Sequence, residues 1–198
     1  MTETTQDLVK IRHAFLDHRM DPETEIVILG TFNPGPVKYA KNVFFYSSGH
    51  NQLWQLLPAA FGEGNLRESG VEERKAFMKR HHVDFIDIIA EVQVDRGNDT
   101  RDDRYLDIRV TEWNDVIAQL ENLRKLRAVL ATRKAPDASV KNISQRMMDV
   151  RTYCKDRGVI FESLFTPSPA ARVSIESKQV LWDEVFARIR AEASAPQS

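Results

Sequence analysis

Residues 25–36 read EIVILGTFNPGP, and the change of character inside this stretch decides the fold. The first part, EIVIL, is short, apolar and rich in β-branched residues, which is typical of a parallel strand buried on both faces. In the second part Asn33 is followed by two prolines, which fix the backbone, and by a glycine between them, which lets it pass close to other groups. Ligands of open α/β sheets bind beyond the carboxyl ends of the strands, so this loop is a candidate wall of a binding site.

Three further apolar runs predict strands, and helical patterns separate them. We expect strands at residues 25–30, 83–89, 126–132 and 159–165. We expect helices over residues 3–19, 51–61, 71–80, 111–123, 139–156 and 174–193, with Thr111 as the N-cap of the fourth, and irregular polar chain over residues 91–107. Strands that alternate with helices predict an α/β fold with a parallel sheet covered on both faces. We interpret residues 1–193 as a single domain and residues 194–198 as a frayed tail.

The composition describes an ordinary globular chain and argues against several classes of protein. The 198 residues carry a net charge of −1, so any affinity for nucleic acid must come from a local patch. The single cysteine, Cys154, cannot form a disulfide within the chain or a thiolate metal cluster. No apolar run approaches the roughly 20 residues of a membrane span, and the segment MTETTQD lacks the features of a signal peptide. We therefore expect a cytoplasmic protein that makes no membrane contact.

The loops after the four strands are the candidate binding loops. Three of them are locally basic, which suits a ligand that carries phosphate. Their basic residues are Lys38 and Lys41 in the first loop, Arg133 and Lys134 in the third, and Arg172 in the fourth. The second loop mixes acids with bases and is better interpreted as a charged surface.

Phe44, Phe45 and Tyr46 are three consecutive rings, and adjacent side chains cannot all face one core. At least one ring should point into a pocket or into solvent, where its face can stack on a nucleobase. The alternative is that two rings pack the loop against the sheet and the third is incidental. His50 lies in the same loop, where it could donate a proton or simply precede the next helix.

Taken together, the four loops resemble the uracil-DNA glycosylase superfamily. Residues 30–36 (GTFNPGP) are similar to the G-x-N-P-G(-P) motif of the mismatch-specific and single-strand-selective branches, with one extra residue before Asn33. The rings at 44–46, followed by HNQLW at 50–54, are similar to the aromatic and N-x-F-W pattern of the hypoxanthine-type branch. DFIDII at 84–89 resembles the second-strand motif, and TPSPA at 166–170 resembles the closing motif. The motifs occur in the family's order over residues 25–175.

The resemblance implies a three-layer α/β/α sandwich with a central four-stranded, mostly parallel sheet. It also implies a monofunctional DNA glycosylase, which flips a base out of DNA and hydrolyses its N-glycosidic bond without a metal or a cofactor. The implied partner is single- or double-stranded DNA, and the protein is expected to be a monomer.

The resemblance assigns roles to individual residues as well. Asn33 would position the attacking water, and Asn51 is the competing candidate. Phe45 or Tyr46 would stack on the flipped base. The implied base-binding residues are Phe44, Phe45, Tyr46 and His50, and the implied DNA contacts are Lys38, Lys41, Arg133, Lys134, Thr166, Ser168 and Arg172.

Three departures from the family pattern bear on the activity. Asp87 stands where relatives often place an asparagine that reads the base, so a donor is lost. An ionised carboxylate could accept from a ring N–H but would repel the carbonyl oxygen of uracil or hypoxanthine, so Asp87 is either protonated, a structural residue or a reader of another base. Thr166 replaces a histidine that stabilises the leaving base in several branches. Ala170 and Ala171 are small where a large apolar wedge is expected, which favours single-stranded substrates. Two alternatives therefore stay open, namely a catalytically silent DNA- or base-binding module and a hydrolase of free nucleosides or nucleotides.

Overall fold

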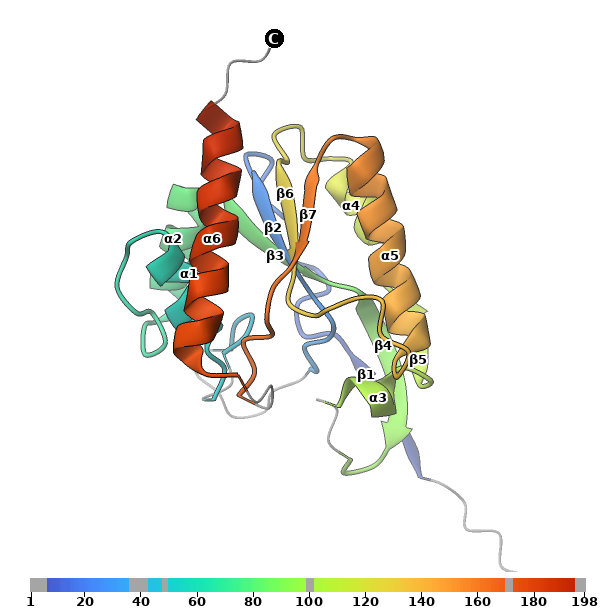
Figure 1. The fold of residues 1–198 in the computed structure, drawn as a ribbon. Helices are drawn as coiled ribbons and strands as arrows, with labels where there is room; N and C mark the ends of the chain where they lie inside the picture. Colours follow the sequence, from blue (N-terminus) through green and yellow to red (C-terminus); the bar gives the residue numbers. More distant parts are fainter. Residues whose placement is uncertain (1–6, 36–42, 48–49, 99–101, 170–172, 195–198) are drawn as a thin grey trace, which may run out of the picture.

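The computed structural model describes residues 7–35, 43–47, 50–98, 102–169 and 173–194 (Figure 1). A four-stranded sheet in the order β3-β2-β6-β7 forms its centre. The strands are β2 (Ile26–Gly30), β3 (Val83–Asp87), β6 (Ala128–Ala131) and β7 (Ile160–Ser163). All of their pairings are parallel. The α/β fold with a four-stranded parallel sheet that the sequence predicts is therefore confirmed.

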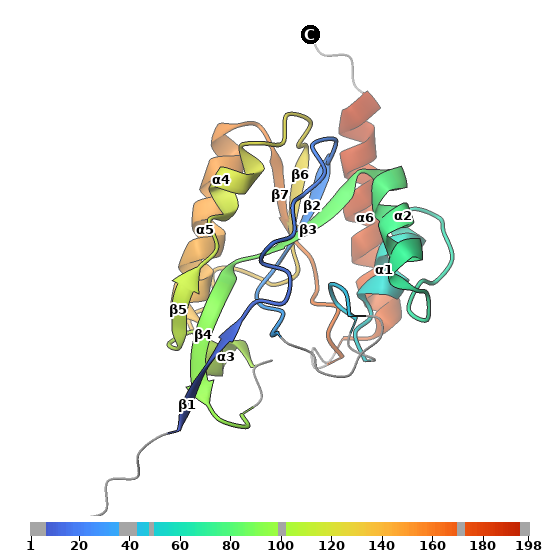
Figure 2. The ribbon, with the colours of Figure 1, turned by 180° about the vertical axis from the view of Figure 1, so that it is seen from behind.

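Helices cover both faces of this sheet and so produce three layers (Figures 1 and 2). One face carries α1 (Leu53–Ala60), α2 (Val71–His81) and α6 (Ile175–Ser194), and the other carries α4 (Val116–Leu120) and α5 (Lys141–Asp156). Side chains of the first three helices share one buried cluster, and those of the other two share a second cluster.

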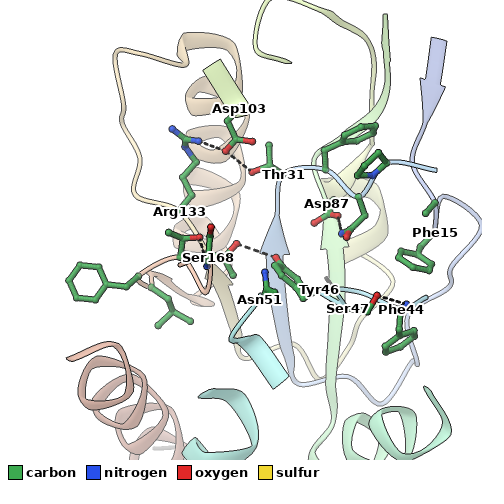
Figure 3. Close-up of a pocket in the computed structure, with 18 of the residues that line it drawn as sticks. Phe15, Thr31, Phe44, Tyr46, Ser47, Asn51, Asp87, Asp103, Arg133 and Ser168 are labelled. Carbon is green, nitrogen blue, oxygen red and sulfur yellow. Dashed lines mark hydrogen bonds and ion pairs between the residues drawn. The ribbon is translucent and has the colours of Figure 1, made fainter. Parts of the chain in front are cut away.

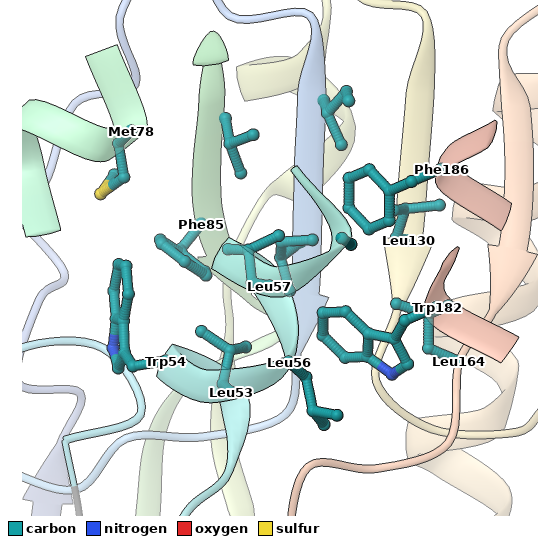
Figure 4. Packing of buried hydrophobic residues seen from close by; sticks show 14 of the residues in the cluster. Leu53, Trp54, Leu56, Leu57, Met78, Phe85, Leu130, Leu164, Trp182 and Phe186 are labelled. Atoms are coloured by element: carbon teal, nitrogen blue, oxygen red, sulfur yellow. The ribbon is translucent and has the colours of Figure 1, made fainter. Parts of the chain in front are cut away.

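Strand β2 is buried along its whole length because it serves both clusters. Side chains alternate between the two faces of a strand. Ile26 and Ile28 therefore pack in the first cluster, whereas Val27 and Leu29 pack in the second. Figure 4 shows the first cluster, in which aromatic rings such as Trp182 lie against aliphatic side chains of α1 and the sheet.

A second sheet, which the sequence did not predict, has three antiparallel strands in the order β1-β4-β5. The strands are β1 (Leu8–Arg12), β4 (Ile89–Asp95) and β5 (Val110–Trp113). Strand β4 begins two residues after the end of β3, so the chain passes almost directly from one sheet to the other (Figure 2).

The second sheet corrects three predicted elements. The helix predicted over residues 3–19 is wrong, because β1 occupies residues 8–12 and pairs with β4. The irregular chain predicted over residues 91–107 is wrong in part, since β4 continues to Asp95 and the short helix α3 spans Asp103–Leu106. The helix predicted over residues 111–123 is divided into β5 and α4.

The N-cap prediction is corrected at the same place. Asp115, not Thr111, caps α4, because its carboxylate accepts a hydrogen bond from the backbone N–H of Ala118 (3.1 Å). Thr111 lies in β5, and its hydroxyl donates to Glu91 Oε1 across the β4–β5 pair (2.9 Å). In each case pairing with a distant strand overrides the local helical pattern.

None of the helices in the described part of the chain is both long and apolar enough to cross a membrane. Helix α6 ends at Ser194, and residues 195–198 of the expected tail lie outside the described residues. The single-domain interpretation stays a prediction.

Candidate active site

A cavity of about 860 Å³ opens at the carboxyl ends of the parallel strands (Figure 3). Its size falls within the roughly 300–1,000 Å³ typical of small-molecule sites. The end of β3 contributes Asp87 to the wall, and the loops after β2, β6 and β7 contribute residues such as Asn33, Arg133 and Thr166. The strand-end rule thus brings together residues that are far apart in the sequence.

Asp87, the last residue of β3, is the centre of a buried hydrogen-bond network. Its Oδ2 atom accepts a hydrogen bond from His13 Nε2 (2.7 Å) and another from the side-chain amide of Asn33. The backbone N–H of Phe15 donates to His13 Nδ1 (3.0 Å), so the hydrogen-bond pattern assigns the proton of His13 to Nε2. A neutral histidine and an amide therefore both donate to one carboxylate oxygen.

Sequence reasoning missed His13 because residues 3–19 were expected to be helical. The chain leaves β1 and forms an antiparallel bridge between His13 and Pro34. Backbone hydrogen bonds from Ala14 N to Asn33 O (2.8 Å) and from Gly35 N to Arg12 O (2.9 Å) join this segment to the NPG loop. The available signal was the alternation in LVKIR at residues 8–12, which indicates a strand that ends just before His13.

Gly30 allows two polar atoms to approach the end of β2. A Cβ atom added at Gly30 would lie 2.1 Å from Asp87 Oδ1 and 2.3 Å from Tyr46 Oη. No side chain fits at these distances, so the glycine is needed for the close approach and not for its backbone angles.

Tyr46 is held in an unusual conformation beside Asp87. Its backbone φ is +54°, a left-handed value that costs a non-glycine residue about 1–3 kcal/mol. Its hydroxyl pairs with Thr132 Oγ1 (3.1 Å), and Thr132 in turn donates to the Leu29 carbonyl (3.3 Å). Tyr46 is therefore the donor to Thr132. Burial, and after it the charge of Asp87, raise the pKa of Tyr46 well above its usual value.

The three consecutive rings divide between the core and the cavity. Phe45 is only 1% exposed and stacks on Phe85 with ring centroids 5.3 Å apart, so the structure places it in the core and not in the cavity wall. Phe44 and Tyr46 do line the cavity. Of the two rings predicted to stack on a base, Tyr46 is the one that can reach a ligand.

Arg133, predicted to contact DNA, is occupied by two carboxylates. Its guanidinium donates to Asp103 and to Asp137 Oδ2 (2.6 Å), while the Thr31 hydroxyl also donates to Asp103 (3.3 Å). Hydrogen bonds, chiefly from Ser139 and then from Arg133, lower the pKa of Asp137 to about 2. Burial raises the pKa of Asp103, although Arg133 opposes this shift. Asp103, in a stretch expected to be irregular surface, was not anticipated.

Some of the remaining predicted site residues line the cavity, and others do not. Asn51 lines the cavity, and its Oδ1 accepts the backbone N–H of Leu53 (2.9 Å) at the start of α1. Thr166 and Ser168 also line the cavity, and Lys134 does so with its ammonium 5.1 Å from the Phe165 ring centroid. His50 is exposed and does not border the cavity. Lys38, Lys41 and Arg172 lie outside the described residues.

Within the described ranges, no group of three or more His, Cys, Asp or Glu side chains could hold a metal ion.

Comparisons with known proteins link this chain to others through its fold. No protein-family model and no curated protein matches the sequence. The structure is similar to the solution NMR structure of a "putative Uracil DNA glycosylase" from Methanosarcina acetivorans, with a TM-score of 0.58 and 20% sequence identity. The similarity covers 86% of this chain and 94% of that one. At this level of identity the comparison establishes a shared fold over most of both chains.

Proposed function

We propose that the protein is an atypical DNA glycosylase of the uracil-DNA glycosylase superfamily, which hydrolyses the N-glycosidic bond of a flipped damaged or modified base. The observation that carries the proposal is the pair Asn33 and Asp87 in the wall of a cavity at the strand ends, hydrogen-bonded to each other and, through Asp87, to His13 behind the wall. The fold shared with the Methanosarcina acetivorans protein and the order of the four sequence motifs support it.

In this mechanism Asn33 positions the water that attacks the sugar. The amide of Asn33 donates to Asp87, which leaves its carbonyl oxygen to accept a hydrogen bond from water. The water oxygen bonds to the sugar carbon C1′ as the bond from C1′ to the base nitrogen breaks. The electron pair of that bond leaves with the base, and the water proton passes to solvent. The carboxylate of Asp87 supplies negative charge near the cationic sugar of the transition state.

Asn51 is the weaker candidate for the water-positioning role. Its Oδ1 already accepts the Leu53 N–H, so a water would have to share that oxygen. Phe44 and Tyr46 are the rings that would contact the flipped base, and stacking of this kind is worth roughly 1–3 kcal/mol per base.

Base release followed by alkaline cleavage tests the proposal. Oligonucleotides that carry uracil, hypoxanthine, xanthine or modified cytosines and adenines are incubated with the protein, and alkali then breaks the strand at each abasic site. We expect breaks with at least one of these bases. Asn33→Ala should slow release about a hundredfold, as the loss of one positioned polar group typically does. Asn51→Ala should retain most of the activity. Asn65→Ala is the matched control, since Asn65 caps only its own exposed turn.

Two results would replace the proposal by one of its alternatives. Binding to DNA that weakens with salt, without breaks at any base, would identify a silent binding module. Cleavage of free nucleosides without cleavage of DNA would identify a nucleoside hydrolase. The ion pairs of Arg133 with Asp103 and Asp137 favour the second of these, because a DNA phosphate would have to compete for that guanidinium. Full activity of Asn33→Ala would contradict the role of Asn33.

A further inference from the structure

We infer that the cavity selects a base whose edge carries an exocyclic amino group, as in modified cytosine or adenine, over the matching base with a carbonyl group. This inference rests on the proposed function and assigns its substrate class. It depends on Asp87 and Tyr46, whose oxygen atoms converge above Gly30.

Of the two carboxylate oxygens of Asp87, only Oδ2 accepts hydrogen bonds from the described residues. Both donors, His13 Nε2 and the Asn33 amide, bond to Oδ2. No residue in the described part of the chain donates a hydrogen bond to Oδ1, the atom that lies above Gly30. Two donors also fix the orientation of the carboxylate, because an acceptor oxygen must stay at the Oδ2 position. Figure 3 shows Asp87 on the side of the cavity opposite Asp103 and Arg133.

The hydroxyl oxygen of Tyr46 also acts as an acceptor. Its hydrogen is directed to Thr132, because the hydroxyl hydrogen of Thr132 is already used by the Leu29 carbonyl. The lone pairs of Tyr46 Oη are therefore left near Asp87 Oδ1, within 2.3 Å of the same point above Gly30. Two acceptors lie side by side, and one of them is a carboxylate.

Such a pair needs a partner with two hydrogens. A ligand that covers these two acceptors without donating to them leaves them unpaired, which is costly, whereas a ligand that donates to them removes this cost. An amino group can donate one hydrogen to each oxygen, whereas a carbonyl oxygen would face both of them with its own negative charge. The carboxylates of Asp103 and Asp137 lie across the cavity and already accept hydrogen bonds from Arg133. The pair above Gly30 therefore differs from them, because it has no such cationic partner among the described residues.

Matched pairs of bases test the inference, since they differ in this group and in the hydrogen of the ring nitrogen beside it. Suitable pairs are 5-hydroxycytosine against 5-hydroxyuracil, and adenine against hypoxanthine, each placed in the same single-stranded oligonucleotide. We expect kcat/KM to favour the amino member of a processed pair by about tenfold or more, because the wrong partner leaves a buried polar group unpaired. Equilibrium binding of oligonucleotides with 2′-fluoro sugars, which resist cleavage, should show the same preference.

Asp87→Asn should invert the preference. His13 and Asn33 both donate to the Oδ2 position, so the amide oxygen must take that position and the amide NH2 must replace Oδ1. The acceptor above Gly30 then becomes a donor that suits a carbonyl oxygen. Asp84→Asn is the matched control, because Asp84 lies on the same strand and bonds to a histidine, His18 (2.7 Å), but does not line the cavity. It should leave the ratio unchanged.

The outcomes separate the inference from the proposed function. Equal release and equal binding of both members of each pair would overturn the inference and leave the glycosylase proposal intact. An unchanged ratio in Asp87→Asn would overturn it as well. Binding that favours the amino member, with no base released by the wild type or by Asp87→Asn, would support the inference and overturn the proposed glycosylase function.

Discussion

At the end of β2, the backbone of Gly30 lies directly beneath a carboxylate and a phenol. Asp87 arrives there from the neighbouring strand, and Tyr46 arrives from the loop that follows β2. Neither side chain could occupy its place if residue 30 carried a methyl group. The site is therefore fixed by the absence of one side chain as much as by the presence of others.

Gly30→Ala should abolish base release and destabilise the fold. The new methyl group would meet Asp87 Oδ1 at 2.1 Å and Tyr46 Oη at 2.3 Å, so both side chains must move. Overpacking of this kind costs about 1–3 kcal/mol, which urea unfolding measures. Gly64→Ala is the control, because no atom lies within 4 Å of its added Cβ. Activity retained in Gly30→Ala would show that the contact above Gly30 is not used.

Residues of the site could be predicted where they follow a predictable strand. Asn33 and Arg133 lie in loops that were identified in this way, because the carboxyl ends of parallel strands meet at one edge of a sheet. Asp87, inside the strand predicted over residues 83–89, was identified only through the family resemblance. His13 and Asp103 were not identified, since they belong to segments whose structure depends on pairing with distant chain. The burial of Phe45 was also not predictable, because sequence does not show which of three adjacent rings turns inward.

At the scale of elements, Lys178 joins α6 to the start of α1 and to the last strand-end loop. Its side chain is fully buried, and its ammonium donates to Gln52 Oε1 (2.7 Å) and to the Ser168 carbonyl (2.8 Å). Gln52 N also donates to the Pro167 carbonyl (2.9 Å). None of the ion pairs found among the described residues involves this ammonium, and burial lowers its pKa below the usual value of 10.5.

Lys178 should make the protein relatively more stable as pH rises. Its folded-state pKa lies below the unfolded value, so the unfolded chain binds more protons between the two values. The free energy of unfolding of the wild type, minus that of Lys178→Met, should therefore increase as pH rises towards the usual lysine pKa of 10.5. The hydrogen bonds lost in Lys178→Met shift this difference by a constant amount. A difference that is flat or falls with pH would contradict the lowered pKa.

Elements were predictable where the signal is local. Helices α1, α2, α5 and α6 and the four parallel strands lie within a few residues of their predicted places, because their apolar patterns are long or uniformly buried. β1 and β5 are short strands with partly exposed side chains, at the two edges of the second sheet. Their partner β4 lies about eighty residues from β1, and no local pattern encodes such a pairing.

At the scale of the whole molecule, the two buried clusters share one sheet. The parallel sheet separates them, and adjacent residues of β2 enter opposite clusters. The second sheet extends the molecule without forming a core of its own, because Val92 and Val94 of β4 pack in the same cluster as α5. Alternating strands and helices in the sequence therefore predicted the layers correctly, although a whole sheet was missed.

Because β2 belongs to both clusters, the molecule should unfold in one step. Ile28→Ala removes packing from the first cluster and Leu29→Ala from the second, and each should cost about 2–5 kcal/mol. Trp54 and Trp182 lie in the first cluster, whereas Trp113 packs against the second, so the measurement uses a Trp113→Phe background in which fluorescence reports on the first side. In Leu29→Ala the urea midpoint measured by tryptophan fluorescence should nevertheless fall, and it should coincide with the midpoint from far-UV circular dichroism. The contrary result is a fluorescence midpoint that stays at the wild-type value while circular dichroism shows a second, earlier transition. It would mean that the two sides of the sheet unfold independently, and it would contradict the single-domain interpretation.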